Sequence, residues 1–74
     1  MDFATAVTTA MRAKGFALRQ MKLGQVDGCQ MIFENPNKRR TTIEATSWEM
    51  SVNTGEMLQN LVARRVEEAV QNAK

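Results

Sequence analysis

The chain has 74 residues, of which 43% are apolar and 24% charged, so it has the length of one small domain spanning residues 1–74. Its single cysteine and its lack of histidine exclude an internal disulfide and a Cys/His zinc site, and no apolar run approaches the ~20 residues of a membrane span. Residues 1–42 carry a net charge of +4 and residues 43–74 carry −2, an asymmetry that favours attraction of an anionic partner.

The first predicted element is an amphipathic helix over residues 3–14. Phe3, Val7 and Met11 recur at helical spacing, and the threonines between them fall on the other face. Asp2 is a suitable N-cap, and Gly15 is placed to end the helix in a left-handed conformation.

Turn residues then divide the chain up to Met50 into three runs of strand length. The first run, 16–23, has Leu18 and Met21 in opposite phases, which predicts a bulge or a late start of the strand. Residues 24–28 end in Asp-Gly, a strong signal for a hairpin turn.

The second run alternates strictly, so its odd positions, Cys29, Met31 and Phe33, are predicted to face the core. An Asn-Pro-Asn turn at 35–37 closes it. The third run, 41–50, is rich in β-branched residues and has Ile43 and Ala45 in the core phase. Continued to its end, this strand directs Trp48 away from the core, although a bulge before it would return the indole inward.

The last predicted element is a long helix beginning after Asn53. Asn53 and Glu56 have the spacing of a capping box, and Val52 with Met57 has that of a hydrophobic staple. The apolar residues that follow lie on one helical stripe. These residues are Met57, Leu58, Leu61, Val62, Val66, Ala69 and Val70.

The predicted fold is α+β, in the order α-β-β-β-α, with a three-stranded antiparallel meander and two helices packed on one face. The other face of the sheet is left in water and should carry mainly polar side chains around a small apolar island of Ile32 and Trp48. The residues predicted for this outer face are Gln30, Ile32, Glu34, Thr42, Glu44, Thr46 and Trp48.

The sequence contains no recognisable catalytic or cofactor-binding set. Without histidine, no Ser-His or Cys-His nucleophile pair can form, and Cys29 lies in a predicted strand without a cationic neighbour in sequence. The four glycines do not have the spacing of a phosphate loop. We therefore expect no enzyme activity, no cofactor, no metal and no small-molecule substrate.

The densest charge lies at the predicted hairpin tip 37–41, where Lys38, Arg39 and Arg40 are consecutive. These cations are candidates for contact with phosphates or with an acidic protein. Arg19 and Lys22 extend the patch if the first strand presents them on the same face.

The element order resembles that of the double-stranded-RNA-binding domain, which also runs α-β-β-β-α over nearly the whole of such a chain. That resemblance implies RNA contacts from the first helix, the loop after the first strand and a lysine cluster opening the second helix. Here the second helix opens with the acidic segment Asn-Thr-Gly-Glu at 53–56, and the first loop lacks a Gly-Pro-x-His pattern. No functional residue is carried over from that family.

These observations predict a small non-catalytic protein-binding module that acts through an open sheet face or edge. Its size class favours an accessory or inhibitory protein of phage or mobile-element type, and its small core favours a homodimer. The predicted partner-binding residues are Ile32, Glu44, Thr46 and Trp48. The alternative is a nucleic-acid-binding module that uses the basic hairpin. With no secretory signal visible at the N-terminus, a cytoplasmic location is expected.

Overall fold

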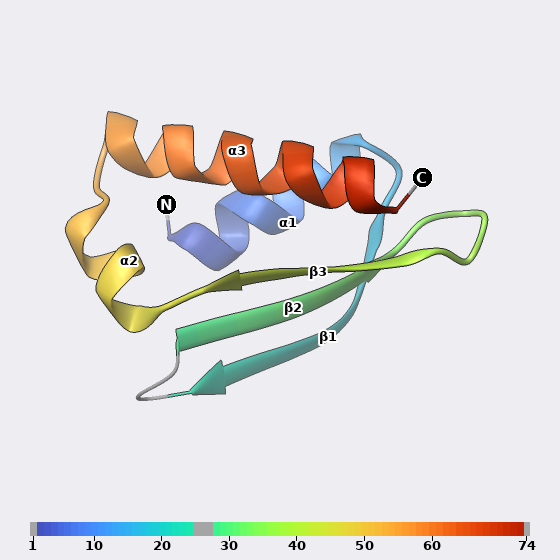
Figure 1. The fold of residues 1–74 in the computed structure, drawn as a ribbon, viewed down its shortest axis with the longest axis horizontal. Coiled ribbons are helices and arrows are strands. Elements are labelled where there is room, and N and C mark those ends of the chain that lie inside the picture. The colour runs from blue at the N-terminus through green and yellow to red at the C-terminus, as the bar shows by residue number, and fades with distance from the viewer. Residues whose placement is uncertain (1, 25–27, 74) are drawn as a thin grey trace.

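The computed structural model describes residues 2–24 and 28–73 and confirms the predicted α+β class. Its three strands form one antiparallel sheet in the order β1-β2-β3, and helices α1 and α3 lie side by side over one face of it (Figure 1). A short helix, α2, which we did not predict, lies between β3 and α3. The elements in chain order are α1 Phe3–Ala13, β1 Ala17–Gly24, β2 Gly28–Glu34, β3 Arg40–Ala45, α2 Ser47–Val52 and α3 Glu56–Asn72.

The core lies between the sheet and the two long helices. Met31 and Phe33 of the central strand are fully buried, as the alternation of β2 predicted. They pack in one cluster with Val7 and Met11 of α1 and with Ile43 of β3. Both helices therefore depend on the apolar face of the sheet for their own burial.

Helix α1 forms as predicted, ending one residue early at Ala13. The carboxylate of Asp2 accepts a hydrogen bond from the backbone N–H of Thr5 at 2.7 Å, which lowers the pKa of this carboxyl below its ordinary value. Gly15 has a φ of +89°, a left-handed conformation that a side chain rarely adopts. The chain then turns into β1.

Strand β1 carries the predicted irregularity, because its register with β2 shifts between Leu18 and Gln20. After the shift, Met21 lies opposite Met31 and Leu23 lies opposite Cys29, on the same face of the sheet as the core. Neither side chain is covered, since 44% of Met21 and 72% of Leu23 remain exposed. The predicted hairpin turn includes residues 25–27, which lie outside the described part of the chain.

The prediction that the third strand continues to Met50 is wrong. Strand β3 ends at Ala45, and Thr46 begins α2 with a complete capping box: its hydroxyl accepts from the N–H of Glu49 at 3.0 Å, and its own N–H donates to the Glu49 carboxylate at 3.1 Å. Trp48 consequently lies on a helix. It is 71% exposed, so it belongs neither to the outer sheet face nor to the core.

The junction between β3 and α2 requires a glycine on the neighbouring strand. Gly28 has a φ of +93°, and a Cβ at this position would lie 2.1 Å from the carbonyl oxygen of Ala45. The backbone of the junction therefore occupies the space that a side chain at residue 28 would need.

Helix α3 follows its predicted stripe, with Leu61, Val62, Val66 and Ala69 buried. Its predicted cap is wrong: Gly55 is the N-cap, and the Asn53 amide donates to the Glu49 carbonyl oxygen of α2 instead of capping α3. In the described ranges, no helix is both long and apolar enough to cross a membrane.

The burial of the α3 stripe generates a stability prediction. Leu61 is 5% exposed, so Leu61→Asp places a carboxylate in the core at a cost of several kcal/mol, comparable to the ~3–5 kcal/mol that such a small core supplies. We expect the variant to unfold, as measured by far-UV circular dichroism and thermal melting. The exposed substitution Asn60→Asp on the same helix is the control and should melt like the parent. A folded Leu61→Asp variant would contradict the helix-on-sheet packing.

Candidate functional site

The uncovered face of the sheet is predominantly polar. The register confirms the outward phase of Gln30, Ile32 and Glu34 on β2 and of Thr42 and Glu44 on β3. Ile32 lies between Gln20 and Thr42 in the ladder and is half-buried. Because Trp48 is on α2, the predicted island of Ile32 and Trp48 does not exist as one sheet surface.

Charged groups on this face pair with one another. The Glu34 carboxylate accepts from Arg19 Nε at 2.7 Å and from Arg40 Nε at 3.5 Å. The hydrogen bond from Arg19 is the main reason that the pKa of Glu34 lies below its ordinary value. The structure thus joins two of the predicted anion-binding cations, although a carboxylate partly neutralises both of them.

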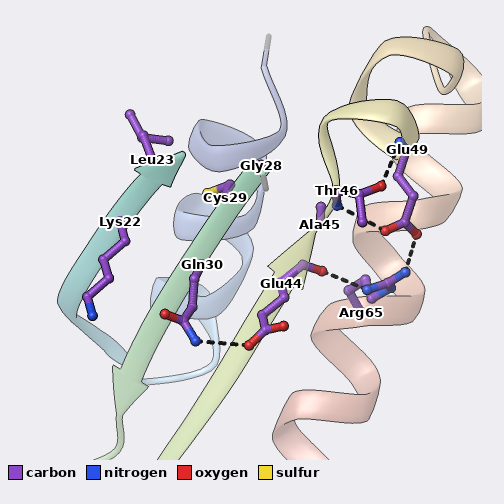
Figure 2. Close-up of a pocket in the computed structure, with 10 residues that line it drawn as sticks. All are labelled: Lys22, Leu23, Gly28, Cys29, Gln30, Glu44, Ala45, Thr46, Glu49 and Arg65. Atoms are coloured by element: carbon purple, nitrogen blue, oxygen red, sulfur yellow. Dashed lines mark hydrogen bonds and ion pairs between the residues drawn. The ribbon is translucent and has the colours of Figure 1, made fainter. Parts of the chain in front are cut away.

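A depression of about 500 Å³ lies where the end of the sheet meets α2 and α3 (Figure 2). It brings together three of the predicted residues, Lys22, Glu44 and Thr46. Most of its polar groups are already paired inside the protein: the Gln30 amide donates to the Glu44 carboxylate at 2.9 Å, and Thr46 is held in the capping box. Lys22 is therefore the charged group best placed to meet a ligand from solvent.

Arg65 of α3 joins three elements at this depression. Its guanidinium donates to the backbone carbonyl of Glu44 at 2.6 Å and forms an ion pair with the Glu49 carboxylate (Figure 2). Glu49 also completes the cap of α2 through Thr46. This set of contacts fixes α2 against β3 and α3, and sequence reasoning missed it because Arg65 lies 16 residues from Glu49.

The basic hairpin tip is a structured loop. The side-chain oxygen of Asn35 accepts from the N–H groups of Asn37 and Arg39 at 3.0 and 2.9 Å, and the Lys38 N–H donates to the Asn35 carbonyl at 2.9 Å. Lys38 has a positive φ of 64°, which is uncommon for a residue with a side chain. Internal hydrogen bonds therefore hold the cations in an exposed loop.

One further cation lies beside this loop. Lys14, at the end of α1, lines a shallow depression together with Arg39. We refer to Lys14, Arg19, Lys38, Arg39 and Arg40 as the basic end. Lys22 does not belong to it, because β1 places it at the other end of the sheet, opposite Gln30.

Apolar side chains are exposed on α2 and in the first turn of α3. Trp48 and Val52 are four residues apart on α2, so they share one side of the helix, and they are 71% and 43% exposed. Met57, in the first turn of α3, is 57% exposed. We call these three residues the apolar corner. The four-residue spacing of Trp48 and Val52 indicates a helix, but the predicted strand over residues 41–50 led us to overlook it.

The one cysteine is a core residue, as predicted. Cys29 is 3% exposed, and burial is the main cause that raises the pKa of its thiol. Within residues 2–24 and 28–73, no group of three or more Cys, Asp or Glu side chains is arranged to hold a metal ion.

No protein-family model matches the chain, and no curated protein or solved structure shows significant similarity to it.

The pairing of Glu34 generates a pH prediction. Because its pKa is lower in the folded chain than in the unfolded one, the unfolded chain binds more protons as the pH falls between these two values. The ionised Glu34 therefore adds its full contribution to the free energy of unfolding above the pKa that it has in the unfolded chain. This contribution is lost as the pH falls through its lower pKa in the folded chain. We expect Glu34→Gln to melt below the parent at about pH 7, with the difference in melting temperature shrinking as the pH falls below the ordinary pKa of a glutamate. An unchanged difference at acid pH would show that the ion pairs are not its cause.

Proposed function

We propose that this chain is a small non-catalytic protein-binding module that makes its contact through the apolar corner. The observation that carries the proposal is the exposure of Trp48, because tryptophan is enriched among the residues that dominate binding energy at protein interfaces. This moves the proposed contact from the sheet face to α2, since the outer face is mostly polar and several of its charges pair internally.

The way in which α2 is held supports this role. The Thr46–Glu49 capping box and Arg65 fix a helix of only six residues, which is too short to be stable by itself. Met50 packs against the core while Trp48 and Val52 face outward. A surface that is ordered before binding loses less conformational entropy when a partner arrives.

A second copy of the chain is the simplest partner for the corner. A two-fold axis allows one patch to cover the same patch on another copy, and the small core of the domain would gain stability from the association. A different protein is the alternative occupant, which would make the chain an accessory or inhibitory protein. The buried Cys29 and the absence of histidine from the sequence support a non-catalytic role.

The single tryptophan provides the test. Trp48→Ala should leave the melting temperature almost unchanged, because exposed substitutions alter stability by no more than about 0.5 kcal/mol. Association should weaken by about 2 kcal/mol or more. Sedimentation velocity over a range of concentrations measures the mass, and the indole fluorescence of the parent should shift to the blue as the corner becomes covered.

Gln71→Ala is the control, since Gln71 is exposed on α3 and belongs to neither the apolar corner nor the β1 strand. It should associate like the parent. A parent mass that stays monomeric at all concentrations would eliminate the second copy as the partner. A Trp48→Ala variant that unfolds would show instead that the indole is needed for the fold.

Nucleic-acid binding through the basic end is a second candidate. The observation that favours it is the ordered loop, which adds Lys38 and Arg39 to Lys14 at the same end of the molecule. Against it, Glu34 pairs with both Arg19 and Arg40, and the loop has no aromatic residue on which a base could stack.

Replacing Lys38, Arg39 and Arg40 together by alanine tests this candidate. If the partner is duplex nucleic acid, each lost phosphate contact should flatten the slope of log affinity against log salt by ~0.9, and the three together by up to ~2.7. Fluorescence anisotropy with labelled duplex DNA and RNA at several salt concentrations measures this slope. Parent protein that binds neither duplex at low salt would eliminate nucleic acid as a partner.

A further inference from the structure

The two edges of the sheet differ in how they are covered. At the β3 edge, Arg65 of α3 donates to the backbone carbonyl of Glu44, approaching from the side away from β2 (Figure 2). At the other edge, β1 pairs with β2 alone in the described sheet. Alternate backbone N–H and C=O groups of an edge strand point outward, so β1 presents groups that another strand can pair with.

Two apolar side chains of β1 are only partly covered. Met21 and Leu23 lie on the helix side of the sheet, yet they remain 44% and 72% exposed beyond the cover of α1. Met21 lines a shallow depression against Thr8 and Thr9 of α1. An incoming strand could place apolar side chains against these residues while its backbone continues the sheet.

The charge beside this edge is positive. Lys22 lies on the outer face of the same strand segment, and Arg12 of α1 lines the depression beside Met21; both are exposed. The sequence of β1, from Ala17 to Gly24, contains no acidic residue. Side chains of an added strand alternate between the two faces, so apolar residues on its helix side and acidic residues on its outer side would complement the edge.

We propose that the β1 edge binds an extended segment of another protein in which apolar and acidic residues alternate, as an additional strand of the sheet. The register bulge between Leu18 and Gln20 confines regular pairing to residues 20–24. A second copy of β1 fits less well, because antiparallel pairing of two such strands gathers Arg19 and Lys22 of both copies without an acidic residue in either strand.

Titration of the full chain with an eight-residue peptide of alternating valine and glutamate tests the proposal. Isothermal calorimetry should show saturable binding, and amide shifts in an NMR spectrum should concentrate at residues 20–24. N-methylation of one alternate set of peptide amides should abolish binding, whereas methylation of the other set should not, because only one set faces β1. Equal effects of the two methylated sets would show that no strand ladder forms.

Reversal of one charge tests the chemistry of the partner. Lys22→Glu should weaken binding of the valine–glutamate peptide by about tenfold and strengthen binding of a valine–lysine peptide by a similar factor. Arg64→Glu is the matched control, since it makes the same change of net charge at an exposed position on α3. If both variants lose affinity equally, the attraction is nonspecific and the proposal fails.

Two further outcomes would overturn the stated partner. A concentration-dependent dimer that the peptide dissociates would assign the edge to a second copy. Duplex nucleic acid that displaces the peptide would assign it to phosphates. The β1-edge proposal does not depend on the apolar corner, so the Trp48→Ala variant should bind the peptide with the affinity of the parent. Failure of the β1-edge proposal can therefore be distinguished from failure of the proposed contact at the apolar corner.

Discussion

The structure depends on one constraint: the sheet can bury only one of its faces. Helices α1 and α3 pack in one core cluster with Met31 and Phe33, and the four buried residues of α3 belong to that cluster. Among residues 2–24 and 28–73, no helix or strand covers the opposite face, which is mostly polar, or pairs with the free edge of β1. The surfaces on which a partner can act are therefore what this single layer of packing leaves uncovered.

The elements with a strong period could be predicted from the sequence because local pattern and burial agree. Met31 and Phe33 alternate with polar residues at period two, the α3 stripe follows a helical period, and Asp2 acts on the backbone three residues away. Helix α2 was missed although its sequence carries two signals, the capping-box spacing of Thr46 and Glu49 and the helical spacing of Trp48 and Val52. Both signals are short, and they directly follow a run of β-branched residues that favours a continued strand.

The candidate site was predicted less well because its geometry depends on residues far apart in the sequence. Glu34 of β2 forms ion pairs with Arg19 of β1 and with Arg40 of β3. Arg65 donates to the carbonyl of Glu44, which lies 21 residues earlier in the sequence. Trp48 shows the consequence of one misplaced boundary: its exposure was predicted, but on the sheet face rather than on α2. The predicted outward position rested on the phase of a strand that ends before Trp48, with a core position as the alternative, so its exposure on α2 required the tertiary structure.

Arg65 contacts both the sheet and the helix that carries Trp48. Its hydrogen bond occupies the Glu44 carbonyl at the β3 edge, and its ion pair with Glu49 fixes the helix that carries Trp48. Arg65 thus holds one carbonyl of the β3 edge and fixes α2, while β1 pairs on one side only in the described sheet. The strand proposed for the β1 edge would not compete with a partner on α2, because the two proposed surfaces share none of their residues.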